Sequence, residues 1–267
     1  MEECRNLLAT GRYLPLAYLR EDASVYSLDL SKTFCYQITG RGRSGKSVFL
    51  RNVACAAKEL GGKIMVVDRM DQQTEQRTAA LVGGQHINTY QGVFDLWKEI
   101  ILTINQRHEL QKELSQQGMV EEEIFERMSG YEKIFVLIAD LNDFAEACIR
   151  PKNGIPVMAP QAENIIAKGA QHNVFFFAAV DTQDLTAVST HGIHRNFVRG
   201  KQGVHLGGEL NTQKLLSYRN IPFAEQSRST KPGTGYVPDA EDSMNAAQIV
   251  IPMNKAISGD VAQGADT

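Results

Sequence analysis

The chain has 267 residues, 43% of them hydrophobic, and a formal net charge of −3. This length fits one α/β domain whose sheet carries helices on both faces, and the hydrophobic fraction can supply its core. The small negative charge excludes a protein that coats nucleic acid generally, since such a surface must be positive. We expect no signal segment and no membrane span, because the longest apolar runs, such as residues 174–180, are too short to cross a bilayer.

Strand and helix patterns alternate along the chain. Short apolar or alternating runs predict strands, and runs with a period near 3.6 residues predict helices. Strands are expected at residues 27–30, 34–39, 63–68, 86–89, 134–139 and 174–180. Helices are expected at residues 48–60, 72–81, 94–116 and 121–128. The continuous apolar runs at 134–139 and 174–180 are typical of central parallel strands that are covered on both sides.

The last part of the chain has a different pattern. Strand patterns at 204–206, 235–237 and 248–251 predict a small antiparallel extension of the sheet. Residues 253–267 offer almost nothing to bury and are expected to form a disordered tail. This leaves residues 1–252 as a single expected domain.

A phosphate-binding loop lies between the strand pattern at 34–39 and the helix pattern at 48–60. Residues 40–47 read GRGRSGKS, which matches G-x-x-x-x-G-K-[S/T] in the strand, loop and helix setting that this motif requires. Lys46 is expected to reach the β- and γ-phosphates of a nucleotide, and Ser47 to offer its hydroxyl to Mg²⁺. The predicted nucleotide-binding residues are Gly40, Arg41, Gly42, Arg43, Ser44, Gly45, Lys46, Ser47 and Val48.

The loop and the periodicity together predict the fold class. We expect an α/β protein of the RecA-like P-loop NTPase type, with a mainly parallel sheet, helices on both faces and a small antiparallel C-terminal extension.

Arg41 and Arg43 lie inside the loop and have two alternative roles. Their guanidinium groups could add charge-assisted contacts to a triphosphate, or they could face solvent or pair with acidic residues such as Glu75. The sequence favours neither alternative.

The end of the strand at 134–139 should carry carboxylates, because Mg²⁺ binds carboxylate oxygens and hydrolysis needs a residue that positions water. The segment reads IFVLIADLNDF, and two registers are open. In the first, Asp140 is the metal-side carboxylate and Leu141 stands at the glutamate position of hydrolysing proteins. In the second, set by Asp143, Ala139 takes the metal-side position and Asp140 the glutamate position. Either register lacks one carboxylate, which predicts weak or absent hydrolysis.

The candidate residues for chemistry follow from these two motifs. The candidate catalytic residues are Lys46 and Asp140, and the candidate metal ligands are Ser47 and Asp140. The strand at 174–180 also departs from an active pattern: Val180 and Asp181 stand where a Thr–Gln pair would sense the γ-phosphate. This departure also indicates weak hydrolysis.

From about residue 13 to about residue 252 the chain resembles the FtsK/SpoIIIE motor family. The resemblance is carried, in this order, by GRYLPLAYLREDASVYSLDL, GRGRSGKS, KIMVVD, IFVLIADLNDF, VFFFAAVD, FVRGKQGVHLGG and KPGTGYV. Within that family the LPL…LDL lead-in and the closing PGTGYV are most similar to the C-terminal, third ATPase module of the type VII secretion ATPases EssC/EccC. Distal modules of these ATPases frequently have degenerate catalytic motifs, in agreement with the missing carboxylate.

The resemblance implies ligands, partners and a location. It implies ATP and Mg²⁺ as ligands, and small helical secreted proteins as substrates. The implied partners are other ATPase modules of the same secretion ATPase and further copies in a hexamer. The implied location is the cytoplasmic face of the bacterial membrane, reached only through other segments. The family also uses an arginine from a neighbouring subunit; Arg195 and Arg199 are candidates, and both can equally be surface cations.

Two other functions stay open. A DNA translocase of the same superfamily would need basic loops facing a pore and a complete carboxylate pair, and neither is evident, so we do not expect DNA as a partner. A regulatory or substrate-docking module would keep only a vestigial nucleotide site.

The remaining reactive side chains predict structural roles. Three of the four cysteines lie in apolar runs, and none has C-x-x-C spacing, which indicates a reducing compartment. Trp97, the single tryptophan, has helical spacing with apolar neighbours and is expected in the core. The histidines, including His191 and His194, show no metal-binding cluster.

Overall fold

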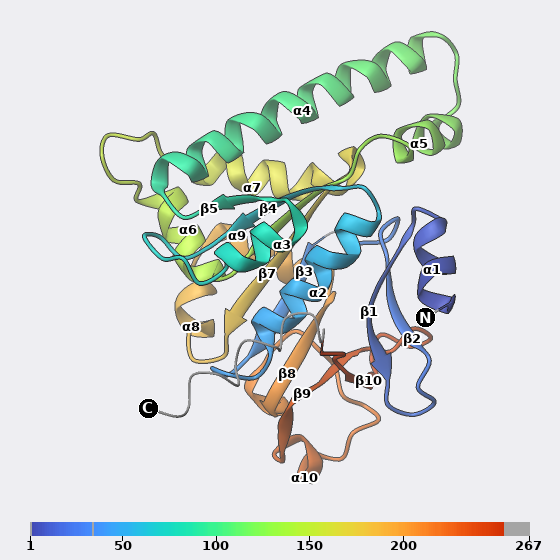
Figure 1. Ribbon diagram of the computed structural model, residues 1–267, viewed down its shortest axis with the longest axis vertical. Coiled ribbons are helices and arrows are strands. Elements are labelled where there is room, and N and C mark those ends of the chain that lie inside the picture. The colour runs from blue at the N-terminus through green and yellow to red at the C-terminus, as the bar shows by residue number, and fades with distance from the viewer. Residues whose placement is uncertain (1, 34, 254–267) are drawn as a thin grey trace.

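The computed structural model describes residues 2–33 and 35–253, and one ten-stranded mixed sheet runs through them (Figure 1). In chain order the strands are β1 (Tyr13–Leu19), β2 (Val25–Asp29), β3 (Cys35–Gly40), β4 (Lys63–Val67), β5 (Gln85–Ile87), β6 (Ile134–Ile138), β7 (Val174–Asp181), β8 (Gly203–Glu209), β9 (Ser229–Pro238) and β10 (Ala246–Val250). Their order across the sheet is β2-β1-β10-β9-β8-β3-β7-β6-β4-β5. The expected tail lies outside the described residues from position 254 onward.

The half of the sheet from β8 to β5 is parallel. β3 pairs with β8 on one side and with β7 on the other, and β6, β4 and β5 continue in parallel beyond β7. Every residue of β3 and β6 is buried, and so is every residue of β7 except the last, Asp181. Strands that are buried on both faces need the continuous apolar sequences seen in β6 and β7. The expected mainly parallel sheet is confirmed.

The antiparallel half differs from the expected C-terminal extension in two ways. First, the strand pattern at 204–206 belongs to β8, which pairs in parallel with β3 and antiparallel only with β9. Second, the antiparallel strands come from both ends of the chain, because β1 pairs with β10 and with β2. The sequence analysis predicts no strand at β1, because its sequence YLPLAYL contains a proline. The partner strand β10 is more than 200 residues away in the sequence, so local patterns do not indicate the pairing.

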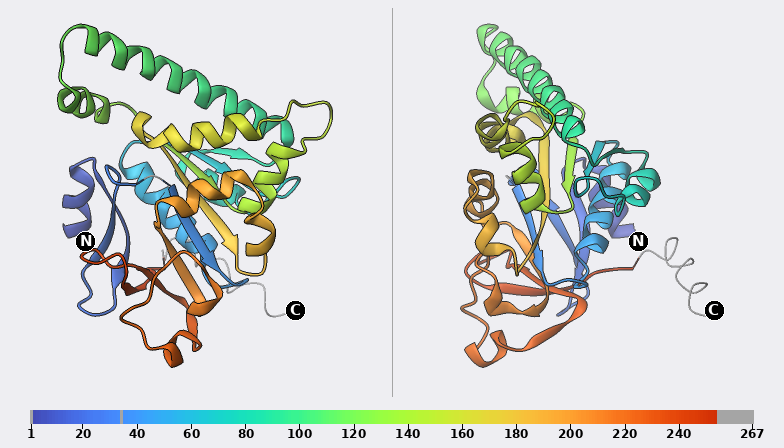
Figure 2. Two further views of the ribbon diagram at one scale, coloured as in Figure 1. Left: turned by 180° about the vertical axis from the view of Figure 1, so that it is seen from behind. Right: turned by 90° about the vertical axis from the view of Figure 1, so that its left-hand side faces the viewer.

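Helices cover both faces of the sheet. They are α1 (Glu2–Ala9), α2 (Lys46–Glu59), α3 (Gln76–Val82), α4 (Tyr90–Gln116), α5 (Glu121–Ser129), α6 (Leu141–Ile149), α7 (Ala159–Lys168), α8 (Leu185–Val188), α9 (Gly192–Arg199) and α10 (Phe223–Gln226). Figure 2 shows α2 and α3 on one face and α6, α7 and α9 on the other. The four expected helices are α2 to α5, with shifted bounds. Among the described residues, no helix is both long and apolar enough to cross a membrane.

Two hydrophobic clusters fill the space between the sheet and these helices. Alternation along β6 places Phe135 and Leu137 in the cluster beneath α2 and α3. It places Ile134, Val136 and Ile138 in the cluster beneath α4, α6, α7 and α9. The carboxyl end of β6 therefore lies between the two layers of helices.

Trp97 is fully buried in the second cluster. Its ring contacts Phe144 and Phe176, and its indole N–H donates to Cys148 Sγ at 3.3 Å. The expected core position is confirmed. Burial raises the pKa of Cys148 to about 12, so this thiol stays protonated at neutral pH.

Replacing Trp97 with Ala should lower the free energy of unfolding by about 3–5 kcal/mol, since a large side chain would leave a cavity. The matched control is Leu102→Ala on the same helix, where the side chain is 61% exposed and the change should stay within about 0.5 kcal/mol. Urea unfolding of both variants is followed by far-UV circular dichroism, because Trp97→Ala removes the single tryptophan and with it the main fluorescence signal. Equal stability of the two variants would contradict the described core.

Candidate functional site

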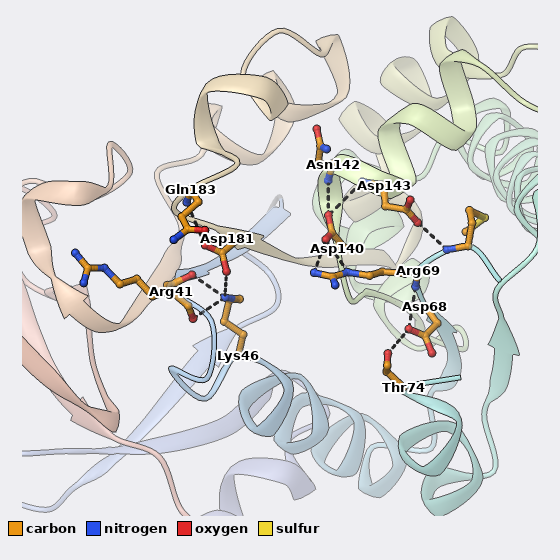
Figure 3. A network of polar contacts seen from close by, with 12 residues as sticks. Arg41, Lys46, Asp68, Arg69, Thr74, Asp140, Asn142, Asp143, Asp181 and Gln183 are labelled. Atoms are coloured by element: carbon orange, nitrogen blue, oxygen red, sulfur yellow. Dashed lines mark hydrogen bonds and ion pairs between the residues drawn. The ribbon is translucent and has the colours of Figure 1, made fainter. Parts of the chain in front are cut away.

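The carboxyl ends of β3, β7, β6 and β4 meet at one edge of the sheet, where the polar side chains of the candidate site gather (Figure 3). In a parallel sheet the segments that follow the strands emerge at the same edge, and ligands bind there. β7 stands between β3 and β6. The loop after β3 is therefore next to the end of β7, and one strand further from the end of β6.

The loop at residues 40–47 needs glycine at two positions for different reasons. A Cβ atom on Gly40 would lie 2.3 Å from the carbonyl oxygen of Leu206 and 2.4 Å from Ser44 Oγ, so no side chain fits. Gly45 has a φ of 110° and is the N-cap of α2, which begins at Lys46, two residues before the helix pattern at 48–60. Because glycine offers no capping side chain, the first N–H groups of α2 are left to a ligand.

Lys46 folds back over the loop and pairs with Asp181. Its Nζ donates to the carbonyl oxygens of Gly40 at 2.6 Å and Arg41 at 2.8 Å, and lies 3.1 Å from Asp181 Oδ2. Asp181 ends β7 and is in register with Gly40. Its Oδ1 accepts the N–H of Gln183 at 3.1 Å. Sequence analysis noted Asp181 at a position that senses the γ-phosphate but did not include it among the candidate catalytic or binding residues. The signal for including it was the acidic side chain at the end of that strand.

Asp140 is the N-cap of α6 and also pairs with Arg69. Its Oδ1 accepts the N–H groups of Asn142 and Asp143 at 3.0 and 3.1 Å. Its Oδ2 accepts from Arg69 Nε at 2.9 Å and lies 2.8 Å from Arg69 Nη2. Both carboxylate oxygens are therefore already bonded, one to the start of the helix and the other to an arginine that follows β4.

The burial of neighbouring residues distinguishes the two registers of this segment. Leu141 is fully buried in the second core cluster, so the glutamate position of the first register points into the core. Ala139 and Asp140 are partly exposed at the end of β6. The second register is therefore the one that places both positions at the edge of the sheet. In that register Ala139 supplies no metal-side carboxylate.

Asp68, the residue after β4, holds the segment that presents Arg69. Its buried side chain accepts hydrogen bonds from Thr74 Oγ1 at 2.5 Å and from the N–H of Glu75 at 2.8 Å, and His86 Nε2 lies 3.2 Å away. Burial alone would raise the pKa of Asp68, but these hydrogen bonds hold it below its ordinary value. Asp68 is therefore a fixed anion that orders the turn before α3.

The two arginines of the loop have different surroundings. Arg41 Nη2 lies 3.7 Å from Glu209 Oε1 at the end of β8. Arg43 is exposed and has a left-handed φ of 62°. Both arginines thus follow the second alternative, although the acidic partner is Glu209: Glu75 is buried and accepts a hydrogen bond from Thr78 Oγ1.

A neutral histidine lies behind the loop. His205 Nδ1 is 3.0 Å from Thr39 Oγ1, and both side chains are buried between β8 and β3. Burial lowers the pKa of His205 to about 4, and the charges of Lys46 and Arg41 act in the same direction. His205 therefore adds no positive charge to the site at neutral pH.

The two candidate arginines for a neighbouring site lie on α9. Arg195 is 78% exposed and lies 3.6 Å from Glu163. Arg199 lines a groove of about 820 Å³ together with Lys32 and Tyr36, at the amino end of β3. Arg199 therefore lies at the end of β3 opposite the loop.

The oxygen donors near the loop fit a magnesium ion. Ser47 lies exposed in the first turn of α2, and its hydroxyl is a hard oxygen ligand, as are the carboxylates of Asp140 and Asp181. Within residues 2–33 and 35–253, no cluster of three acidic, histidine or cysteine side chains could hold a metal by itself. This set of donors suits an ion held mainly by phosphate oxygens, as Mg²⁺ commonly is.

The remaining loop residues differ in their exposure. Gly42 is exposed at the tip, Ser44 is buried against β8, and Val48 packs at the edge of the first core cluster. The loop, the start of α2 and a strand inserted between β3 and β6 together define a P-loop ATPase fold of the RecA-like type.

Known structures share this fold. The cytoplasmic domain of EssC gives a TM-score of 0.73 at 13% identity, over 90% of this chain and 44% of that one. ATPases 2 and 3 of Thermomonospora curvata EccC, in complex with a signal sequence peptide, give 0.66 at 14% identity, over 92% and 41%. The pCW3 conjugation coupling protein TcpA with ATPγS gives 0.57 at 18% identity, over 89% and 66%. Sequence comparison matched no protein-family model and no curated protein.

These comparisons confirm the expected resemblance at the level of the fold. Nearly the whole described chain superposes on ATPase domains of EssC and EccC, at identities that show shared architecture. The chain spans only about two fifths of the length of those proteins.

Proposed function

We propose that this chain is a nucleotide-binding module of a bacterial type VII protein secretion ATPase. The observation that carries the proposal is the loop at residues 40–47, held between β3 and the uncapped start of α2. The likeness to EssC and EccC ATPase domains supports secretion as the process.

The proposed ligand is ATP with Mg²⁺. The backbone N–H groups of residues 40–47 and the dipole of α2 receive the phosphates, and Lys46 exchanges its contacts with Gly40 and Arg41 for phosphate oxygens. Ser47 and one carboxylate at the edge hold the ion, which neutralises phosphate charge when bound.

We propose that this chain hydrolyses ATP weakly or not at all. Phosphoryl transfer depends on positioning and charge neutralisation, and both need carboxylates at the end of β6. Ala139 has no carboxylate. The carboxylate of Asp140 is already bonded to Arg69 and to a backbone N–H group at the start of α6. Nucleotide binding without rapid turnover suits a module that responds to its neighbours.

The proposed partners are further ATPase modules and secreted proteins. EssC and EccC are longer chains with several ATPases, and the EccC structure contains a signal sequence peptide. We infer a similar setting here, in which several modules are joined in one polypeptide and assemble into a hexamer. Other segments would hold the assembly at the cytoplasmic face of the membrane. A short helix from a small secreted protein would dock on it.

A DNA-handling motor is the alternative that a specific observation favours. The likeness to the conjugation coupling protein TcpA covers 89% of this chain. Against it stand the net charge of −3 and the four glutamates of α5, since a DNA motor must neutralise backbone phosphates. A vestigial docking module is a further alternative, and the nucleotide experiment below tests it.

Replacing Lys46 with Ala should weaken binding of ATP or ADP at least tenfold, or about 1.4 kcal/mol, because a charged contact to phosphate is lost. Lys58→Ala is the matched control, since this lysine is exposed near the other end of α2 and donates to Leu81 O. Isothermal titration calorimetry with and without Mg²⁺ measures both. No binding by the parent chain would favour the vestigial module.

Phosphate release by the unmodified chain should be very slow, and Ala139→Asp combined with Asp140→Glu should raise it, since the second register then has both carboxylates. The matched variant is Leu141→Glu, which completes the first register. It should fail to activate and should destabilise the fold, because Leu141 is fully buried. Rapid release by the unmodified chain would refute the proposal of weak hydrolysis.

Paired titrations should show peptide binding rather than DNA binding. The C-terminal helix of a secreted protein would bury apolar anchors, so its affinity should change little between 50 and 300 mM salt. Duplex DNA should bind weakly, with affinity that falls steeply over that range. Tight, salt-sensitive DNA binding without peptide binding would support the translocase instead.

A further inference from the structure

We propose that Asp181 makes the loop selective for a nucleoside diphosphate over a triphosphate, and that a divalent cation is needed to reduce this preference. The inference deepens the proposed nucleotide binding and rests on it.

The position of Asp181 relative to Lys46 is the first step. The Lys46 Nζ and Asp181 Oδ2 atoms are 3.1 Å apart, and the two side chains are only 16% and 19% exposed (Figure 3). The lysine of this motif reaches the β- and γ-phosphates. A carboxylate that shares its ammonium group therefore stands beside the outermost phosphate of a bound triphosphate.

The register of the sheet fixes this carboxylate in place. Asp181 is paired with Gly40 in the β3–β7 ladder, so its backbone is tied to the first residue of the loop. Asp181 Oδ1 also accepts the N–H of Gln183, which limits rotation of the side chain. Asp181 is therefore held where the γ-phosphate would arrive.

The neighbouring cations do not offset this negative charge. Arg41 is paired with Glu209, and Arg69 with Asp140. His205, behind the loop, is neutral because burial lowers its pKa to about 4. The three paired cations and three carboxylates sum to zero, and Arg43, the remaining cation of the loop, is exposed to solvent. Among the paired groups, a further negative charge on the ligand therefore meets no surplus positive charge.

A diphosphate is affected less than a triphosphate. The β-phosphate is received by backbone N–H groups of the loop and by the start of α2, which Asp181 does not occupy. The γ-phosphate would depend on Lys46, whose ammonium group already pairs with Asp181, and repulsion between like charges in a partly buried site is strong. A divalent cation bound by the phosphates would offset the Asp181 charge, so Mg²⁺ should admit the triphosphate.

The experiment compares ADP and ATP by calorimetry on the full chain, in EDTA and in Mg²⁺, for the unmodified protein, Asp181→Asn and Asp184→Asn. Asp184 is the matched control, because it lies three residues on and contacts no lysine within the described residues. In EDTA the unmodified chain should bind ADP at least tenfold more tightly than ATP. Mg²⁺ should reduce the ratio of the ATP dissociation constant to the ADP dissociation constant. Asp181→Asn should lower the same ratio, measured in EDTA, at least tenfold.

The outcomes separate this inference from the function on which it rests. Asp184→Asn should leave the ratio unchanged, and Asp181→Ser should reproduce the shift if the asparagine variant does not fold. Nucleotide binding with the same ratio in the unmodified and Asp181 variants would overturn this inference alone. Absence of binding in every variant would overturn the proposed function as well.

Discussion

The parallel pairing of β3 between β8 and β7 is the constraint on which the rest of the site depends. All six residues of β3 are buried, so the strand cannot shift in register without exposing apolar groups or losing two ladders of hydrogen bonds. That register brings Asp181 beside Gly40 and sets the carbonyl oxygen of Leu206 against it. The tight turn, the uncapped start of α2 and the contacts of Lys46 all follow from where β3 ends.

The edge of the sheet is neutralised by its own side chains. Three ion pairs surround the loop: Lys46 with Asp181, Arg69 with Asp140, and Arg41 with Glu209. The Lys46–Asp181 pair is largely buried, so its two charges would be costly if left unpaired, whereas the arginines of the other two pairs are half exposed and their pairs contribute less. A nucleotide that enters must exchange at least one pair for phosphate contacts, and the strength of binding therefore reflects a difference between two sets of interactions.

The sequence predicted the features that are local and missed those that depend on distant contacts. The loop, α2 and the apolar strands β6 and β7 follow from spacing and periodicity within a few residues. The ion pairs at the edge could not be predicted, because Arg69 meets Asp140 only after β4 and β6 have paired. The register around Asp140 was ambiguous for a similar reason: nothing local shows that Leu141 turns into the core. β1 required a partner from the opposite end of the chain.

The pairing of β1 with β10 has a consequence during synthesis. Tyr18 is in register with Val250, so one edge of β1 has no partner until nearly the whole described chain has been made. At about 5–20 residues per second, the intervening segment takes roughly 10–50 s to emerge from a ribosome. During that time β1 presents unpaired N–H and C=O groups that another nascent chain can bind. β10, which joins β1 to β9, is the last of the described strands to be made, so the β1–β2 hairpin joins the rest of the sheet only after residue 250 has emerged.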